Sequence, residues 1–265
     1  MTDQIWGIFG REEKYHEKKY NSKKEFIKMP PPEKSYIKDF DYSLLKPLLN
    51  NFNKIKKNVI LLTTGSFNPI HRMHIEILNI AYNFLLSLKD YNILCGFISP
   101  SADCYVKHKA PPLIPFDLRC RMINTALEEY SYEYQYNYLK IFLHPWEGNQ
   151  SHFIDFPYVI EEIQNKLNQY YGNIKLIYVC GMDVFLECKN YLNKNAIVID
   201  RKPFKNNQYR DYPKDSLYLI RDENSKPYSS TLIRNCFKNH NYGEIEKMTF
   251  PKVAEMIISF YKNNF

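Results

Sequence analysis

The stretch "NVILLTTGSFNPIHRMHIEIL", residues 58–78, decides the fold. Its first half is a short apolar, β-branched run of the kind found in buried strands. A glycine-serine turn follows, and the second half has the pattern of a helix. The sequence therefore predicts a strand, a tight turn and a helix, with His71 and His74 on the first turns of that helix.

Strand and helix patterns alternate along the rest of the chain. Apolar strands without polar alternation indicate a sheet that is covered on both faces. Intervening helices of about 10 to 15 residues indicate right-handed parallel crossovers. We therefore expect an α/β fold with a doubly wound, mainly parallel sheet, helices on both faces and a helical C-terminal end. The expected strands are 58–64, 92–99, 138–144, 174–180, 196–200 and 216–220, and the expected helices are 72–88, 117–131, 157–171, 183–192, 229–239 and 251–264.

Charge divides the chain into a polar leader, residues 1–57, and one domain, residues 58–265. The leader contains the extended segment "MPPPEK" and a possible short helix interrupted at Pro47. Residues 1–58 hold 13 Lys and Arg against 8 Asp and Glu, so +5 of the net +7 lies there. A basic tail on a near-neutral body is more often a solvated segment than a groove for a polyanion, so we expect no nucleic-acid partner.

Composition also indicates where in the cell the protein is expected. No run of 18 apolar residues occurs, so we expect no membrane partner, and the N-terminus lacks the apolar core of a signal peptide. The six cysteines form no C-x-x-C pair, which favours reduced thiols in a cytoplasmic or nuclear protein.

The candidate functional residues follow predicted strands. In a parallel α/β sheet, ligands bind beyond the carboxyl ends of the strands. The segments in that position are "GSFNPIHRMH", "SPSADCYVKHK", "HPWEGN" and "CGMDV". The segments with candidate functional residues are therefore also the loops at the carboxyl ends of the predicted strands, where ligands are expected to bind.

The histidine pair admits three interpretations: a metal site, a phosphate site, or two ordinary histidines. Zinc would require a third ligand and usually an H-E-x-x-H spacing. Here Arg72 lies between the histidines and suits phosphate better than a metal. Gly65 permits unusual backbone angles and close approach of a ligand, and the N–H groups of Ser66 and Phe67 are available to an anion at the helix N-terminus. We favour the phosphate site.

The segment "PYSSTLIRNCFK", residues 227–238, resembles a second anion site. Pro227 stops the preceding chain, Ser229 or Ser230 can cap a helix, and Arg234 lies in its first turns. Capping without any function explains this motif equally well when it is taken alone.

Together these segments resemble the eukaryotic-type nicotinamide/nicotinate mononucleotide adenylyltransferases of the nucleotidyltransferase superfamily. "GSFNPIHRMH" resembles the superfamily's [H/T]-x-x-H turn, and "SSTLIR" its S-[ST]-T-x-[IK]-R signature. "SPSADCYVK", "PWE" and "CGMDV" resemble three further family motifs, in the same order, and "AIVIDR" resembles the strand that precedes the last signature. The resemblance covers residues 58–237 and implies a Rossmann-like fold.

The resemblance implies adenylyl transfer from ATP to nicotinamide or nicotinate mononucleotide, with Mg²⁺ bound through the ATP phosphates. It implies a catalytic role for His74, Lys107 and Arg234, and commonly a homo-oligomer. The ATP-binding residues implied are Gly65, Ser66, Phe67, His71, His74, Gly181, Asp183, Arg201, Ser230, Thr231 and Arg234, and the mononucleotide-binding residues are Ser66, Phe67, Lys107 and Trp146.

One departure from the family concerns the pyridine pocket. The family's second pyridine-stacking tryptophan is absent, and Phe185 or Tyr191 could substitute for it. Two other functions remain open: another small nucleotidyltransferase of the superfamily, for example one acting on phosphopantetheine, and a non-catalytic nucleotide-binding or chaperone-like protein.

Overall fold

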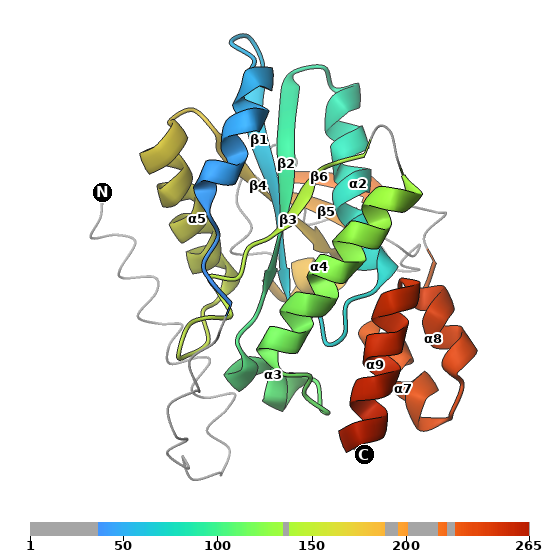
Figure 1. Ribbon diagram of the computed structural model, residues 1–265. Coiled ribbons are helices and arrows are strands. Elements are labelled where there is room, and N and C mark those ends of the chain that lie inside the picture. The colour runs from blue at the N-terminus through green and yellow to red at the C-terminus, as the bar shows by residue number, and fades with distance from the viewer. Residues whose placement is uncertain (1–36, 135–137, 189–195, 201–216, 222–225, 265) are drawn as a thin grey trace. The chain divides into compact units, whose positions relative to one another are not determined.

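A six-stranded parallel sheet forms the centre of the molecule (Figure 1). The computed structural model describes residues 37–134, 138–188, 196–200, 217–221 and 226–264, and residues 35–265 form one compact unit. The strand order is β3-β2-β1-β4-β5-β6, and every pairing between these strands is parallel. The strands are β1 (Lys57–Gly65), β2 (Tyr91–Pro100), β3 (Ile141–Leu143), β4 (Lys175–Gly181), β5 (Ala196–Asp200) and β6 (Leu217–Arg221).

Helices cover both faces of this sheet, as the apolar strands predict. Along β1, Val59 and Leu61 belong to one buried apolar cluster, and Ile60 and Leu62 belong to a second cluster on the opposite face. The helices are η1 (Tyr42–Asn51), α2 (Arg72–Ser87), α3 (Asp103–Lys109), α4 (Phe116–Glu133), α5 (Phe156–Tyr171), α6 (Met182–Cys188), α7 (Ser230–Lys238), α8 (Tyr242–Met248) and α9 (Pro251–Asn264). The prediction of a Rossmann-like α/β fold with a helical C-terminal end is confirmed.

Two helices were not predicted, and both are short. Helix α3 has the mostly polar sequence "DCYVKHK", with only Val106 buried, so it lacks a clear apolar period. Helix α8 has two buried residues, Ile245 and Met248. The expected helix at 183–192 is seen as α6, and residues 189–195 lie outside the described part.

The segment before β1 packs into the domain. Element η1 is a 3₁₀ helix that runs through Pro47, and the Asp41 side chain caps it by accepting from the Ser43 N–H. Tyr42 and Leu45 are buried in the apolar cluster that also contains α5. The division at residue 57 between leader and domain stays a prediction, but residues 42–51 clearly contribute to the core. Within the described ranges, no helix has both the length and the apolar character to cross a membrane.

Candidate active site

The candidate site lies where the strand order reverses. On one side of β1 the next strands in the sheet are β2 and then β3, and on its other side they are β4, β5 and β6. In doubly wound sheets the crevice at such a switch point, beyond the carboxyl ends, is where ligands bind. The turn after β1 and the Gly181–Asp183 segment after β4 flank this point, and the Thr64 hydroxyl lies 2.9 Å from the Tyr178 hydroxyl across the two strands.

Unusual backbone geometry in the turn occurs at Phe67 and not at Gly65. Phe67 has φ +43°, in the left-handed region that a residue with a side chain rarely adopts. Its ring is buried and packs against Gly65. The expectation of special backbone angles at Gly65 is therefore wrong, because Gly65 completes β1. Successive N–H groups around a left-handed residue can form a concave arrangement that suits an anion, and in this turn that backbone position is Phe67.

The two histidines stack on each other at the start of α2. Their ring centroids are 3.6 Å apart, with an interplanar angle of 25°. The backbone N–H of His71 donates to Nδ1 of His74 at 3.1 Å. Because Nδ1 of His74 accepts, a neutral His74 ring carries its proton on Nε2, where it can donate to a phosphate oxygen. The edge of the Phe67 ring packs against His74, with centroids 4.8 Å apart, and fixes the imidazole further.

Helix α7 brings the second predicted anion site to this turn. Ser229 is its N-cap and accepts from the Leu232 N–H at 3.1 Å. The Ser230 hydroxyl donates to the Pro69 carbonyl at 2.7 Å, and Arg234 donates to the Asn68 carbonyl at 2.7 Å. Arg234 also donates to the Thr231 hydroxyl at 3.0 Å. Two motifs separated by about 160 residues in the sequence therefore meet.

A buried arginine that sequence reasoning missed joins the turn to α3. The Arg119 side chain is 0% exposed and donates to the carbonyls of Ser66 and Ser101, at 2.7 Å each. It also forms an ion pair with Asp103 at 2.8 Å. The Asp103 carboxylate in turn accepts from the Phe116 N–H at 3.0 Å. A charged residue at a buried position of the amphipathic helix α4 was a signal that the sequence offered.

Asn68 connects the same turn to the segment between α3 and α4. Its side-chain amide donates to the Pro112 carbonyl at 2.9 Å, and its carbonyl oxygen accepts from the Ile114 N–H at 2.8 Å. Lys107, on α3, is exposed. Its helix is positioned relative to the turn by Arg119 and Asn68.

Trp146 lies in the loop 144–150, which follows the edge strand β3. It is half-buried and packs against the apolar cluster around α5. The next residue, Glu147, is buried, and its carboxylate accepts from the Ser99 hydroxyl at 2.9 Å. Burial raises the pKa of Glu147 to about 8, although hydrogen bonds from Ser101 and Ser99 oppose this change. Gly148 packs so closely on the Phe116 ring that a Cβ there would lie 1.8 Å from ring atom Cε2.

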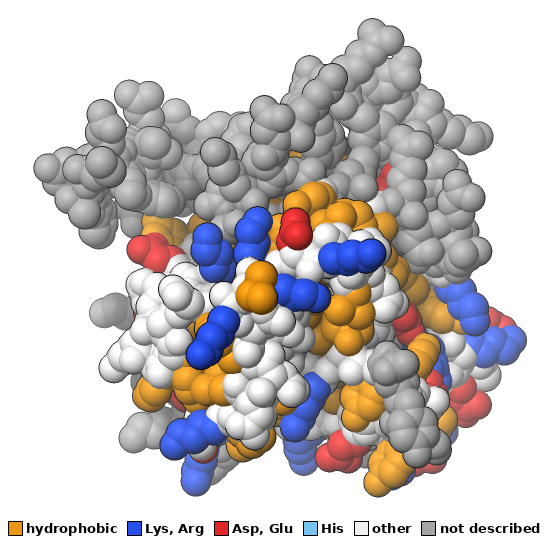
Figure 2. Space-filling model, turned by 90° about the horizontal axis from the view of Figure 1, so that it is seen from above, with side chains coloured by type: hydrophobic (Ala, Val, Ile, Leu, Met, Phe, Trp, Pro, Cys, Tyr) orange, Lys and Arg blue, Asp and Glu red, His pale blue; other side chains and the backbone are white. Residues whose placement is uncertain are grey.

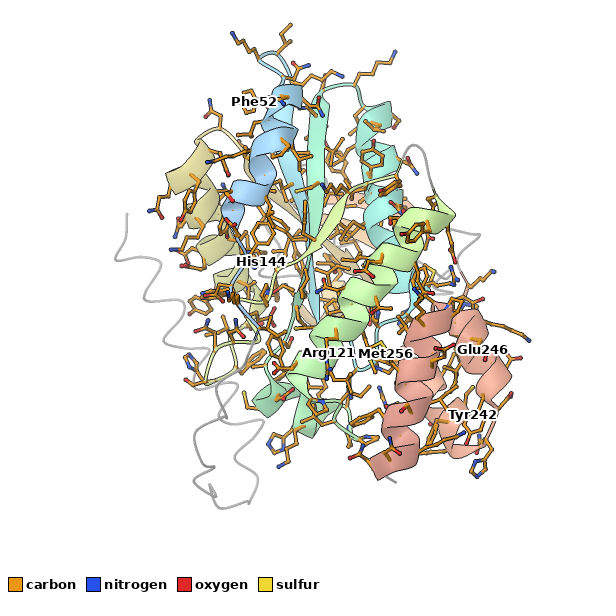
Figure 3. All side chains as sticks on the ribbon, viewed as in Figure 1. Phe52, Arg121, His144, Tyr242, Glu246 and Met256 are labelled. Atoms are coloured by element: carbon orange, nitrogen blue, oxygen red, sulfur yellow. The ribbon has the colours of Figure 1, made fainter. Side chains whose placement is uncertain are left out.

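His144 anchors the other end of this loop to η1. Its Nε2 lies 3.0 Å from the Tyr42 hydroxyl, and the rings of Phe40 and Phe97 pack around the imidazole. Burial lowers the pKa of His144 to about 4, so the ring is neutral at physiological pH. Figure 3 shows His144 beside the segment that leads into η1.

The expected ribose pair lies after β4. The Asp183 carboxylate is exposed and folds over Gly181, where a Cβ would lie 2.5 Å from its Oδ1. Phe185 is buried in the apolar cluster, so it does not present a ring to a ligand. Arg201 and Tyr191 lie outside the described residues. Across the ranges that the structure describes, no group of three or more His, Cys, Asp or Glu side chains could hold a metal ion.

A parallel sheet with a turn of this kind leading into a helix at its switch point is typical of nucleotide-binding α/β proteins. A family model described as cytidylyltransferase-like matches residues 62–236, so the chain belongs to the cytidylyltransferase-like family.

Relatives with curated names match shorter stretches. Nicotinamide/nicotinic acid mononucleotide adenylyltransferase from Arabidopsis thaliana is 29% identical over 135 residues, which are 49% of this chain and 52% of the relative. Nicotinamide/nicotinic acid mononucleotide adenylyltransferase 1 from Bos taurus is 40% identical over 55 residues, which are 21% of this chain and 20% of the relative. The chain thus spans about half, or less, of these relatives' lengths. The predicted resemblance to this group is confirmed.

Solved structures support the fold. Plasmodium falciparum nicotinic acid mononucleotide adenylyltransferase complexed with APC superposes with a TM-score of 0.55 at 22% identity, covering 77% of this chain and 96% of that chain. The same enzyme complexed with NaAD gives a TM-score of 0.55 at 18% identity, with the same coverage. At these identities the likeness concerns the fold alone.

Proposed function

We propose that this protein transfers the adenylyl group of ATP to nicotinate or nicotinamide mononucleotide, forming a dinucleotide and pyrophosphate. The observation that carries the proposal is the meeting of His71 and His74 with Ser230 and Arg234 around one turn at the switch point. The names of the curated relatives support the choice of substrates.

The reaction is an in-line displacement at phosphorus. An oxygen of the mononucleotide's 5′-phosphate attacks the α-phosphorus of ATP, the bond to the bridging oxygen breaks, and pyrophosphate leaves. No protein nucleophile is required, so catalysis consists of positioning and charge stabilisation. His74 would donate from Nε2 to an α-phosphate oxygen as charge develops, while His71 and the N–H groups of Ser66 and Phe67 hold the neighbouring phosphates.

The remaining residues would bind the two substrates. Arg234, Ser230 and Thr231 would exchange their hydrogen bonds within the protein for the β- and γ-phosphates of ATP. Asp183, beside Gly181, would accept from the ATP ribose, and Arg201 would assist. Lys107 would hold the mononucleotide's phosphate, and Trp146 would stack on its pyridine ring.

Mg²⁺ is proposed to arrive with ATP. The turn and α7 present N–H, imidazole, hydroxyl and guanidinium donors, which suit phosphate oxygens, while Mg²⁺ prefers phosphate and water oxygens. The ion would neutralise phosphate charge when bound. We further propose a homo-oligomer in the cytoplasm or nucleus, which size-exclusion chromatography with light scattering and localisation of a tagged chain would test.

The decisive experiment incubates purified protein with ATP and either mononucleotide, and measures NAD or deamido-NAD together with pyrophosphate. We expect both products in equal amounts, dependent on both substrates. Parallel reactions with CTP, or with phosphopantetheine as acceptor, test the other nucleotidyltransferase functions. Tight ATP binding without any product would instead support a non-catalytic nucleotide-binding protein.

A further inference from the structure

A lysine-rich loop lies at the edge of the sheet opposite the candidate active site. Residues 52–57 connect η1 to β1 at the amino ends of the strands. Nine residues of β1 separate this loop from the turn at Gly65, a distance of roughly 30 Å. Phe52, at the end of η1, is at the top of Figure 3, far from the C-terminal helices that carry Tyr242.

The loop presents one apolar side chain to solvent. Ile55 is 97% exposed, the largest exposed fraction among the large hydrophobic residues in the described part of the chain. A network of asparagines holds this conformation. The N–H groups of Ile55 and Lys56 both donate to the Asn53 side chain at 2.9 Å, and the Asn58 amide donates to the Asn53 carbonyl at 2.7 Å. Asn92, from β2, donates to the Asn58 side chain at 2.7 Å. Because the loop is braced in this way, Ile55 is presented at little cost in conformational entropy.

Exposed lysines are concentrated at the edge of the sheet that carries Ile55. The segments 52–57, 88–92 and 172–175 meet at this edge, because Lys57 pairs with Tyr91 and Val59 pairs with Lys175. Their only carboxylate is Asp90. Their exposed lysines are Lys54, Lys56, Lys57, Lys89 and Lys175. Viewed onto this end of the molecule, Lys and Arg side chains lie among hydrophobic ones near the middle of the face, and acidic side chains lie mainly toward its rim (Figure 2).

One of these lysines occupies a backbone position that glycine or asparagine would fill more easily. Lys89 has φ +61°, in the left-handed region, just after α2 ends. A side chain there costs about 1 kcal/mol relative to glycine. The chain nevertheless places an exposed positive charge at this position, next to Lys57, whose N–H donates to the Asp90 carbonyl at 2.9 Å.

We propose that this loop docks the protein on a membrane surface rich in anionic phospholipid. Ile55 enters the headgroup region, and the five lysines around it lie against the lipid phosphates and carboxylates. The edge that carries the candidate active site then faces away from the membrane and stays open to substrates. The absence of an apolar span led us to expect no membrane partner, but surface docking requires no span.

Nucleic acid fits the loop less well. A projecting isoleucine has no counterpart on a phosphate backbone, whereas the acyl boundary of a membrane accommodates it. Nucleic-acid sites typically combine basic side chains with stacking aromatic rings or arginines that read bases. The three segments that meet at this edge contain two aromatic residues, Phe52 and the half-buried Tyr91, but no arginine.

The test is co-sedimentation of the full chain with vesicles of phosphatidylcholine alone or with about a third phosphatidylserine. We expect binding to the anionic vesicles only, weakening as salt is raised. Lys54→Gln combined with Lys56→Gln should weaken the partition coefficient by about tenfold or more, since each lysine near such a surface contributes appreciably. Ile55→Ser should weaken it about fivefold with no change in charge.

A matched control carries the same charge change elsewhere. Lys238→Gln with Lys252→Gln, both exposed on the C-terminal helices, should bind vesicles as the wild type does. Wild-type binding by the Lys54/Lys56 and Ile55 variants would overturn the proposal, since another part of the chain would then be responsible. It would also be overturned if vesicles were not bound while DNA or RNA was bound through the lysines independently of Ile55.

Discussion

Two loops at the carboxyl edge of the sheet are built in different ways. In the turn 65–74, the imidazole pair is fixed by neighbours in sequence, because the His71 N–H donates to His74 three residues further on. In the loop 144–150, the fixing partners are distant. His144 meets Tyr42, which is 102 residues away, and Asn149 donates to Asp39, which is 110 residues away.

This difference indicates different tasks. In the proposed reaction His74 donates to a charge that develops only in the transition state, and the orientation of its ring is set by contacts within the turn, from the His71 N–H and the Phe67 ring. In the proposed function the loop 144–150 would contact the mononucleotide through Trp146, which is half-buried, and the next residue, Glu147, is buried. We therefore expect changes in the turn to reduce the rate of the chemical step, and changes in the loop to alter binding or stability.

The largest effect should come from His74→Ala. In the proposed mechanism its Nε2 stabilises the transition state more than bound ATP, so kcat should fall by about 10²–10³ with little change in KM for ATP. Steady-state assays with ATP and the mononucleotide measure both constants. The matched control is His240→Ala, which changes an exposed histidine after α7 and should leave both kcat and KM for ATP unchanged. Near-normal kcat in a folded His74→Ala protein would remove the assigned role.

Arg234→Lys tests whether the donors from α7 act mainly in ATP binding, whereas those of the turn act in the chemical step. Arg234→Lys keeps the charge but loses the two-pronged guanidinium, so kcat/KM for ATP should fall about 10–100-fold, mainly through KM. Lys238→Gln, one turn further along α7, should leave both constants unchanged. If kcat fell as severely as in His74→Ala, Arg234 and His74 would act together in the chemical step, and Arg234 would not be mainly an ATP-binding residue.

Trp146→Leu examines the loop. Leucine keeps apolar bulk but removes the aromatic face, so KM for the mononucleotide should rise about tenfold while KM for ATP stays nearly constant. Amide and acid substrates should be affected alike, because stacking barely distinguishes them. A joint loss of ATP binding and thermal stability would mean that Trp146 belongs to the core and that the pyridine pocket lies elsewhere.

The same contrast explains what the sequence could predict. The strand, turn and helix at residues 58–78 are a local pattern that the sequence predicts directly. The phosphate site at His71 and His74 was favoured from the local residues, whereas the motif at residues 227–238 was distinguished from ordinary capping only by the family resemblance, and both sites stay predictions. Arg119 and Asn68 were missed because their roles depend on carbonyls and N–H groups brought together by the fold. The same holds for Glu147, whose burial depends on packing around Ser99. Helix α3 was missed because polar short helices carry little periodic signal.

The last prediction concerns stability and not activity, through the pH dependence that Glu147 introduces. Burial raises its pKa to about 8 from an ordinary value of 4.5, so the folded protein keeps this carboxyl protonated at neutral pH. In the unfolded chain the same group loses its proton above its ordinary pKa. Folding therefore takes up a proton between these two values, and the contribution of Glu147 to stability falls as pH rises through that window and levels off above about pH 8.

Glu147→Gln removes this titration, because the amide stays neutral at every pH and its oxygen can still accept from the Ser99 hydroxyl. Thermal unfolding of both proteins from pH 5 to pH 8.5 should show the Tm of the variant rising relative to wild type as pH increases. The shift from 4.5 to about 8 corresponds to roughly 4–5 kcal/mol at about 1.4 kcal/mol for each pKa unit, so we expect a difference of about 10 °C, at about 2–4 °C for each kcal/mol. Groups that titrate in both proteins cancel in this difference, and Glu161→Gln, an exposed carboxylate on α5, should give a curve parallel to wild type. If the Glu147→Gln curve were also parallel, the folded carboxyl would be ionised, and the loop 144–150 would be more open to water than its contacts with Ser99 and Phe116 imply.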